Sequence, residues 1–262
     1  MSSKPAILVT GASSGIGAVY ADRFAHRGHD LVLVARDGTR LEALAERLRR
    51  EAGVAVDIVQ ADLTRPADLA AVEARLREDA RIGVLVNNAG AALTGSFVDQ
   101  GPDQISGLVA LNVTALTRLA AAVAPRFVAA SSGTIVNIGS VVGFVPEFGM
   151  AVYGATKAFV QYLSQALHTE LGPKGVYVQA VLPAATRTEI WQRAGIDVNA
   201  LPAVMETGAL VDAALAGFDR RETVTIPPLP DASQWDAYDR ARAAMIPNLN
   251  QAEPAERYRA RV

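Results

Sequence analysis

The sequence contains no cysteine, and this excludes disulfide bonds, thiolate metal ligands and a thiol nucleophile. Histidine is also scarce: there are three, His26, His29 and His168, and their spacing does not resemble a zinc site. We therefore expect no metal. Lys and Arg number 25 against 27 Asp and Glu, which gives a formal charge of −2. This balance offers no electrostatic argument for nucleic acid or an anionic membrane as a partner.

Apolar segments that would target a membrane are also lacking. The first five residues lead directly into a strand-like segment, without the apolar stretch and cleavage site of a signal peptide. The run from Ile105 to Ala130 is strongly apolar, but Asn112, Arg118, Pro125 and Arg126 interrupt it. A buried amphipathic helix explains this run better than a membrane span. We expect a cytoplasmic protein.

What the sequence does have is a regular alternation of apolar strands and helices. Half of the 262 residues are hydrophobic and one fifth are charged, as in a globular chain. Continuous Val, Ile and Leu runs separated by helices predict a parallel sheet covered on both faces. The expected fold is therefore a doubly wound, Rossmann-type α/β domain of about seven strands. The predicted strands cover residues 6–9, 31–34, 56–59, 84–86, 134–138, 177–181 and 224–226.

Local signals mark some helix starts and a change of character near the C-terminus. Thr39 and Glu42 form a capping-box pattern that predicts the start of the second helix, and Pro66 suits the first turn of the third. Residues 1–230 are expected to form the catalytic domain, and residues 231–262 a helical extension. Trp235, Tyr238 and Met245 recur in this extension at the spacing of a buried helical stripe. It is expected to pack over the substrate entrance or a neighbouring subunit, or to be a surface helix with a frayed end.

A glycine-rich turn, Thr10-Gly11-Ala12-Ser13-Ser14-Gly15-Ile16-Gly17, joins the first strand to the first helix. This arrangement places backbone N–H groups and a helix N-terminus against a pyrophosphate. Gly11 would permit the tight turn, Gly15 the approach of the phosphates, and Gly17 the close packing of the helix.

Tyr153 and Lys157 are four residues apart, and Ser140 precedes the tyrosine by thirteen. Positions i and i+4 lie on one face of a helix, so the ammonium is expected near the phenol. A nearby positive charge favours the phenolate, which predicts a lowered pKa for Tyr153 and proton exchange near neutrality.

These motifs, with Asn87-Asn88-Ala89-Gly90 and Asn112, resemble the short-chain dehydrogenase/reductase family from about Ala6 to Ile226. The resemblance implies that Tyr153 is the general acid toward a carbonyl oxygen and that Ser140 donates a hydrogen bond to that oxygen. Lys157 would hold the nicotinamide ribose. Asn112 would hold a water in the proton relay, although a helix-kinking or polar core role is equally open.

The resemblance implies further cofactor contacts along the chain. Gly90 would give access to the adenosine side, within a motif that is mainly structural, and Asp62 would face adenine. The family's Pro-Gly pair is Pro183-Ala184 here, and a glycine with positive φ could not be replaced by alanine without strain. The cofactor set is Gly11, Ser13, Ser14, Gly15, Ile16, Gly17, Arg36, Asp62, Leu63, Asn88, Ala89, Gly90, Tyr153, Lys157, Pro183 and Thr188.

The charge at the end of the second strand bears on which cofactor is used. An NAD site usually has Asp or Glu there, about 20 residues past the glycines. This chain has Ala35 and Arg36, and a guanidinium can pair with a 2′-phosphate. NADP(H) is therefore the predicted cofactor. Asp37 is an alternative ribose acid, or a turn-forming residue before Gly38.

The expected substrate pocket is apolar. Its lining would include Phe97, Phe144, Phe148 and Trp191 besides Ser140 and Tyr153, with Leu93 and Met150, although about half of these side chains could be packing residues instead. Such a lining favours an apolar or aromatic ketone or aldehyde. The predicted function is NADP(H)-dependent carbonyl reduction or alcohol oxidation. The alternatives are a non-redox epimerase, dehydratase or lyase of the same fold, and a nucleotide-sensing binding protein.

The helix that carries Tyr153 has more apolar surface than one sheet face can cover. Phe159, Tyr162 and Leu163 lie on it between Ala158 and Ala166. With the apolar Ile105–Val128 run, this surface predicts a homodimer or homotetramer, as the resemblance also implies.

Overall fold

The computed structural model describes residues 4–259. The chain divides into two compact units, Met1–Pro228 and Leu229–Val262. The division falls two residues before the predicted boundary at residue 230. Every predicted catalytic and cofactor residue belongs to the first unit.

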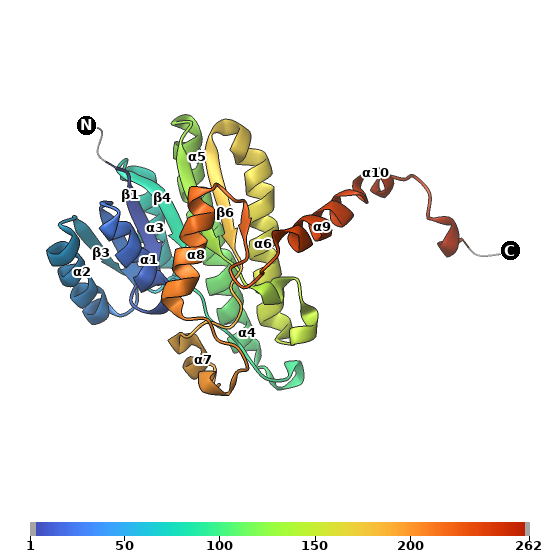
Figure 1. Ribbon diagram of the computed structural model, residues 1–262, viewed down its shortest axis with the longest axis horizontal. Helices are drawn as coiled ribbons and strands as arrows, with labels where there is room; N and C mark the ends of the chain where they lie inside the picture. The colour runs from blue at the N-terminus through green and yellow to red at the C-terminus, as the bar shows by residue number, and fades with distance from the viewer. Residues whose placement is uncertain (1–3, 260–262) are drawn as a thin grey trace. The chain divides into compact units, whose positions relative to one another are not determined.

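The first unit is built on one parallel sheet of seven strands in the order β3-β2-β1-β4-β5-β6-β7 (Figure 1). The predicted fold is confirmed. In the first half, Ile7 pairs with Leu31 and Leu31 with Val56. The strands are β1 (Ala6–Thr10), β2 (Leu31–Ala35), β3 (Val56–Gln60), β4 (Ile82–Asn87), β5 (Gly133–Ile138), β6 (Val176–Val181) and β7 (Val224–Thr225).

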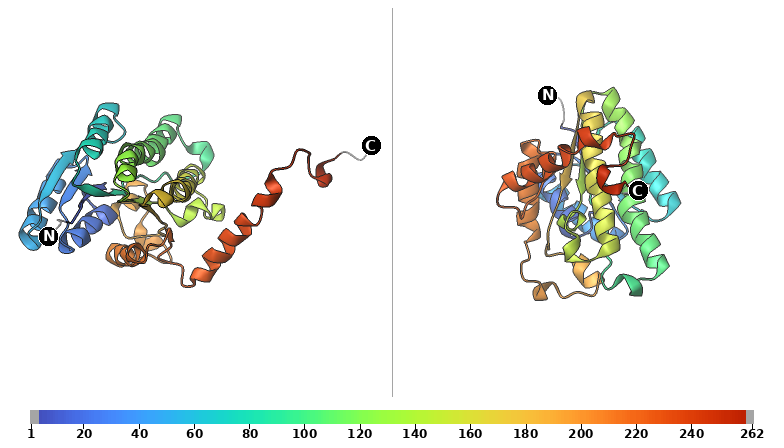
Figure 2. Two further views of the ribbon diagram at one scale, coloured as in Figure 1. Left: turned by 90° about the horizontal axis from the view of Figure 1, so that it is seen from above. Right: turned by 90° about the vertical axis from the view of Figure 1, so that its right-hand side faces the viewer.

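Helices cover both faces of this sheet (Figure 2). The core on one face includes side chains of α1, α2 and α8, and the core on the other includes side chains of α3, α5 and α6. The helices of the first unit are α1 (Gly15–His26), α2 (Gly38–Ala52), α3 (Pro66–Glu78), α4 (Pro102–Val109), α5 (Leu116–Ala129), α6 (Ala151–Leu171), α7 (Glu189–Arg193) and α8 (Thr207–Asp219).

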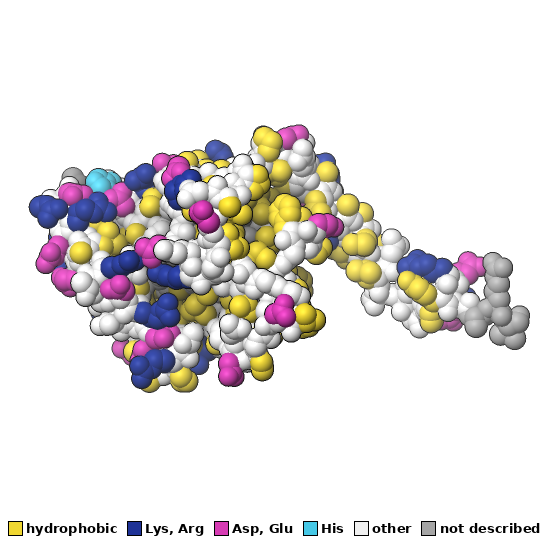
Figure 3. Space-filling view, turned by 90° about the horizontal axis from the view of Figure 1, so that it is seen from below, with side chains coloured by type: hydrophobic (Ala, Val, Ile, Leu, Met, Phe, Trp, Pro, Cys, Tyr) yellow, Lys and Arg dark blue, Asp and Glu magenta, His cyan; other side chains and the backbone are white. Residues whose placement is uncertain are grey.

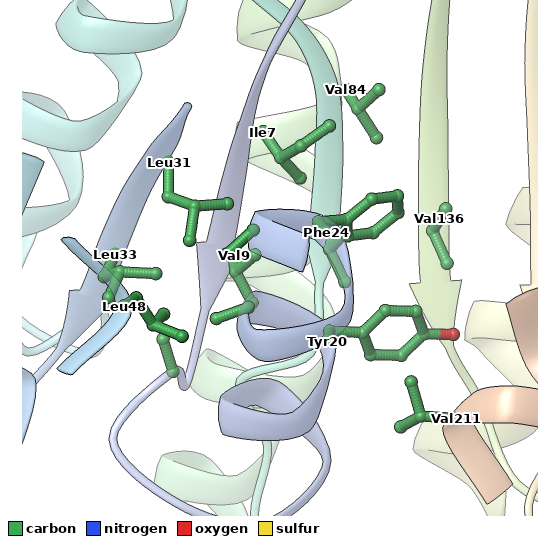
Figure 4. Packing of buried hydrophobic residues seen from close by; sticks show 14 of the residues in the cluster. Ile7, Val9, Tyr20, Phe24, Leu31, Leu33, Leu48, Val84, Val136 and Val211 are labelled. Carbon is green, nitrogen blue, oxygen red and sulfur yellow. The ribbon is translucent and has the colours of Figure 1, made fainter. Parts of the chain in front are cut away.

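The central strands β1 and β2 are almost wholly apolar because each side of the sheet has its own core. On β1, Ile7 and Val9 face one cluster, whereas Ala6 and Leu8 face the other. Successive strand residues point to opposite faces. Figure 4 shows the first cluster, in which the rings of Tyr20 and Phe24 from α1 pack beside the sheet. A strand with two buried faces gives a continuous hydrophobic run.

The second helix begins differently from the prediction. Its N-cap is Asp37, whose carboxylate accepts a hydrogen bond from the backbone N–H of Arg40 at 3.0 Å. The predicted cap at Thr39 is wrong because the helix already begins at Gly38, with Asp37 as its N-cap. Asp37 thus caps the start of α2, which favours the turn-forming interpretation of this residue over a role as the ribose acid.

The apolar stretch predicted as one helix contains a π-helical segment, Ala110–Ala115, between α4 and α5. Within the described residues, Pro102–Ala129 is the one helical stretch long and apolar enough to cross a membrane by length and composition, and 44% of its most apolar window is buried inside the protein. Helices of a protein core pass the same test. Here the stretch supplies Leu119, Val123 and Phe127 to the second cluster.

The second unit contains the helices α9 (Ala232–Ala243) and α10 (Ile246–Leu249), drawn in red in Figure 1. Trp235 stacks on Tyr238 with ring centroids 5.2 Å apart. Tyr238 and Met245 are exposed in a single chain, so the expected packing of this face stays a prediction. The predicted helix forms as α9, but residue spacing alone does not show what covers the apolar face of a helix.

Candidate active site

The predicted site residues lie at the carboxyl ends of the parallel strands or directly after them. The chain reverses its direction across the sheet between β1 and β4, which lie side by side although β2 and β3 separate them in sequence. Ligands of doubly wound folds bind in the crevice at such a switch point. Figure 3 views the molecule from this end of the sheet and shows hydrophobic side chains in a hollow of the surface.

The glycine turn has the geometry that its sequence predicts. Gly11 and Gly15 have φ of +66° and +55°, a region that favours glycine. A Cβ on Gly17 would lie 2.4 Å from the carbonyl oxygen of Gly11 and 2.5 Å from Nδ2 of Asn88. Gly17 therefore allows the first turn of α1 to approach the turn itself and the end of β4.

The Asn-Asn-Ala-Gly segment ties β4 to β1. Asn88 Nδ2 donates to the carbonyl of Thr10 at 2.9 Å. The hydroxyl of Thr10 accepts hydrogen bonds from the backbone N–H groups of Asn88 and Ala89, each at 3.0 Å. This confirms the mainly structural role predicted for the motif.

Gly90 lies close to Asn112 and Lys157. A Cβ on it would be 3.2 Å from Oδ1 of Asn112 and 3.7 Å from Nζ of Lys157. The expectation that Gly90 gives access to the adenosine side stays a prediction. A side chain at this position would meet the amide oxygen of Asn112.

The N-terminus of α1 fits an anionic group. Its N-cap residue, Ser14, makes no side-chain capping bond, and no acidic residue lies in the first turn. The first N–H groups of a helix lack partners within the helix and attract negative charge. Ser13 and Ser14 lie beside them in the turn, and Ile16 packs against the core below. These residues can hold the phosphates of a dinucleotide.

Tyr153, Lys157 and Ser140 come together as predicted. Lys157 is 6% exposed, and its Nζ lies 5.7 Å from the centroid of the Tyr153 ring. That ammonium donates to the carbonyl of Ile138 at 2.9 Å. The side chains of Tyr153 and Ser140 are hydrogen-bonded to each other, and the Ser140 hydroxyl also donates to the carbonyl of Pro183 at 3.2 Å.

The pKa of Tyr153 departs from the prediction. Burial raises it to about 12, and the hydrogen bond with Ser140 opposes this only in part. Burial also lowers the pKa of Lys157 to about 8. The lowering predicted from Lys157 is wrong, because desolvation of the phenolate is the largest effect on the pKa of Tyr153. Tyr153 therefore holds its proton at neutral pH.

Asn112 sits in the π-helical segment and is almost fully buried. Its Oδ1 accepts from the N–H of Ala91, and its Nδ2 donates to the carbonyl of Ala91, both at 3.0 Å. Nδ2 also donates to the hydroxyl of Thr156 at 3.1 Å, and this hydroxyl donates to the carbonyl of Tyr153 at 2.7 Å. Asn112 thus links the loop after β4 to α6.

The residues predicted for adenosine lie after β2 and β3. Arg36 is exposed, so its guanidinium is accessible to a phosphate. The pKa of Asp62 is lowered: burial works against the charged carboxylate, but hydrogen bonds from Thr64 and the charge of Arg36 prevail. Leu63 is 5% exposed and packs in the second core cluster, so its side chain faces away from the groove.

The loop after β6 tolerates its alanine. The described non-glycine residues with positive φ are Ser131, Met150 and Arg221, so Ala184 does not have the backbone that would strain it. Further along, Thr188 is the N-cap of α7. A Cβ on Gly15 would lie 3.2 Å from the methyl carbon of Thr188, which places the threonine against the glycine turn.

The predicted apolar lining is only partly exposed. Phe97 and Phe148 are 62% and 63% exposed in short 3₁₀ turns after β4 and β5. Phe144 packs against the cluster of Val141, Ala180 and Leu182. Trp191 in α7 is partly buried, and its indole N–H donates to the carbonyl of Thr186 at 2.8 Å.

A cleft of about 850 Å³ lies between the start of α1 and the segment from Arg187 to Asn199. It contains Gly15 and Thr188 from the predicted cofactor set. A second hollow, of about 400 Å³, lies between α3 and α5 and contains none of the predicted site residues.

Comparisons with known proteins agree with this geometry. The family model described as short chain dehydrogenase matches residues 5–199. The chain belongs to the short-chain dehydrogenase family. A curated relative, the very-long-chain 3-oxoacyl-CoA reductase of Anas platyrhynchos, is 35% identical over 191 residues, which are 70% of this chain and 60% of the relative. This short-chain dehydrogenase thus spans less than two thirds of the length of that relative.

Solved structures cover the chain more fully. A short-chain dehydrogenase from Sphingobium yanoikuyae, in complex with NADPH, is 71% identical with a TM-score of 0.96, over 97% of this chain and all of that one. The bulky-bulky ketone specific alcohol dehydrogenase of Comamonas testosteroni is 59% identical with a TM-score of 0.92, over 99% of this chain and all of that one.

Sequence reasoning missed several residues of this short-chain dehydrogenase. Thr10 and Thr156 organise the site through their hydroxyls, and their positions beside the glycine turn and Lys157 were a usable signal. Arg40 donates to both carboxylate oxygens of Glu189, at 2.8 and 2.9 Å. No local pattern joins two residues that are 149 positions apart.

Proposed function

We propose that the protein is an NADP(H)-dependent oxidoreductase that interconverts ketones or aldehydes and alcohols, with carbonyl reduction as its main direction. The observation that carries this proposal is the group formed by the buried Ser140 and Lys157 and the half-buried Tyr153 beside the groove of the glycine turn. The NADPH complex of the Sphingobium yanoikuyae relative supports the choice of cofactor. The exposed Arg36 after β2 supports it independently.

The chain's own residues supply the proton and the electrostatic stabilisation. Bound NADPH supplies the hydride for the carbonyl carbon. Tyr153 donates its hydroxyl proton to the carbonyl oxygen, which converts the carbonyl to an alcohol and leaves a phenolate. The Ser140 hydroxyl donates to the same oxygen while negative charge develops there. The Lys157 ammonium stabilises the phenolate until solvent returns the proton.

The high pKa of Tyr153 suits this direction. A phenol with a pKa of about 12 is protonated at neutral pH, and carbonyl reduction needs the proton-bearing form. Alcohol oxidation needs the phenolate instead, and the positive charge of an oxidised nicotinamide favours that form.

The substrate is proposed to be a ketone with apolar or aromatic substituents on both sides of the carbonyl. The exposed rings of Phe97 and Phe148 offer apolar surface on two separate turns. The Comamonas testosteroni relative, specific for bulky-bulky ketones, supports this substrate class. A site bounded by two apolar turns gains binding energy from both substituents.

The test is the oxidation of NADPH by the purified protein with a ketone panel. We expect higher kcat/KM for ketones with two aryl or long alkyl groups than for acetone. If no ketone of the panel supports the oxidation of NADPH, the reductase proposal is overturned. A non-redox enzyme or a nucleotide sensor then becomes the better explanation. Equal rates across the panel would overturn only the substrate class.

We also propose that the protein assembles as a homodimer or homotetramer through α6 and the helical stretch before β5. Tyr162 and Phe159 of α6 are 76% and 38% exposed in one chain, and Val109 of α4 is 38% exposed. Exposed apolar side chains on neighbouring helices suit a symmetric interface. Light scattering of the purified protein measures the mass.

The expected cytoplasmic location remains a prediction.

A further inference from the structure

One ion pair joins α2, which follows β2, to α7, whose N-cap Thr188 lies beside the glycine turn. Arg40 lies in the first turn of α2, at the adenosine end, and Glu189 is the first residue of α7, directly after Thr188. Nη1 of Arg40 donates to Oε1 and Oε2 of Glu189 at 2.8 and 2.9 Å. The pair therefore connects the helix that follows β2 to the segment that follows β6.

Both partners are held by further charges. Oδ2 of Asp37 lies 3.4 Å from Nε of Arg40, and Arg193 donates to Oε2 of Glu189 at 2.7 Å. The mutual hydrogen bonds raise the pKa of Arg40 and lower that of Glu189. Charges of alternating sign thus run from the N-cap of α2 to the end of α7, and networks of this kind are more effective than isolated surface pairs.

The segment held by Glu189 covers the glycine turn. The methyl group of Thr188 lies against Gly15, whose backbone is part of the predicted phosphate site. Trp191 is fixed to the carbonyl of Thr186 at 2.8 Å, and the hydroxyl of Thr94 donates to the carbonyl of Ala194 at 2.8 Å. The segment from Thr186 to Ala194, which we call the cover, is therefore hydrogen-bonded to the loop after β4 and within itself. The Arg40–Glu189 pair attaches it on the third side, to α2.

We propose that the Arg40–Glu189 pair is a clasp that holds α7 over the cofactor groove and slows the release of the dinucleotide. The inference rests on the proposed use of NADP(H). Neither residue is placed at the reacting atoms, so both are positioning residues. Because the guanidinium is bonded to a carboxylate of the cover, the clasp acts on cofactors with and without a 2′-phosphate alike. This separates Arg40 from Arg36, which is proposed to bind the phosphate.

The test measures the binding of NADPH and NADH to Arg40→Gln, Glu189→Gln and the double variant. Fluorescence titration gives Kd, and stopped-flow displacement gives the dissociation rate. We expect each single variant to release both cofactors about two- to fivefold faster, the range for a partly exposed ion pair. The double variant should be no worse than either single one.

A matched control and a measurement without cofactor complete the design. Arg50→Gln removes an exposed pair with Glu51 on the same helix and should leave both cofactors unaffected. In the cofactor-free protein, both clasp variants should be cleaved faster by a protease within residues 187–200, because the cover opens more often.

Three results would overturn the clasp. If Arg40→Gln weakens only NADPH while Glu189→Gln tightens it, Arg40 binds the 2′-phosphate and Glu189 competes with it. If release and proteolysis are unchanged in every variant, the pair is an ordinary surface contact. If the wild-type protein binds neither cofactor, the proposed function fails and the clasp fails with it, which distinguishes that outcome from the other two.

Discussion

Tyr153 is a half-buried phenol whose pKa is raised to about 12, so it carries its proton at neutral pH and can donate it to a carbonyl oxygen. The change Tyr153→Phe removes the proton and keeps the ring. Turnover of ketones should fall by a factor of about 10² or more, the usual contribution of general acid catalysis, while the Kd for NADPH changes less than about twofold. Steady-state kinetics and fluorescence titration measure the two quantities. Near-normal turnover in this variant would contradict the assigned proton donor.

Lys157 sets the expected pH dependence. Burial lowers its pKa to about 8, so the residue is charged below about pH 8 and neutral above it. The neutral amine cannot stabilise the phenolate, and kcat/KM for reduction should therefore fall as the pH rises through about 8. Lys157→Arg keeps its charge, so its profile should be slower throughout but flat up to about pH 10. A fall near pH 8 that persists in this variant would assign the titration to another group.

Arg36 is the residue on which cofactor preference depends. In Arg36→Asp a carboxylate repels the 2′-phosphate and can accept hydrogen bonds from free ribose hydroxyls. The ratio of kcat/KM for NADPH to that for NADH should fall by at least about tenfold, the effect of roughly 1.4 kcal/mol. Kinetics with both cofactors give the ratio. An unchanged ratio would show that Arg36 does not bind the 2′-phosphate. Ser14 and Arg40 would then be the next residues to test.

At the scale of elements, the strands were predictable and the helix details less so. Runs such as Leu31–Val34 indicate strands because they are short, rich in β-branched residues and separated by helical segments, as expected of strands buried on both faces. The sequence left a helix-kinking role open for Asn112, and the structure places this residue in a π-helical segment, but its bonds to Ala91 and Thr156 were not predictable. Those bonds and the Arg40–Glu189 pair are tertiary contacts between distant segments, which no local pattern encodes.

The packing of α1 on the glycine turn gives a prediction at this scale. In Gly17→Ala the new Cβ would meet the backbone carbonyl oxygen of Gly11 at 2.4 Å, so the start of α1 must shift. Because overpacking costs about 1–3 kcal/mol and the N–H groups of the turn move with the helix, both Tm and NADPH affinity should fall. Gly107→Ala is the matched control: nothing lies within 4 Å of its Cβ, and alanine is the better helix former by about 1 kcal/mol. Equal behaviour of the two variants would contradict the packing argument.

At the scale of the whole molecule, the second unit has the most apolar surface for its size. Five of the eleven large hydrophobic side chains exposed among the described residues belong to it: Tyr238, Met245, Ile246, Leu249 and Tyr258. The first unit has its own core on both sides of the sheet, so it should fold without residues 231–262. A chain ending at Pro230 should therefore keep its Tm within about 3 °C, since the core of the first unit is retained. If the exposed side chains are covered by another subunit or by bound substrate, the truncated protein should show a smaller mass by light scattering or an altered order of preference among ketones. Unchanged mass together with unchanged preference would show that the extension has neither role, and a large loss of Tm would show that the first unit depends on it for folding.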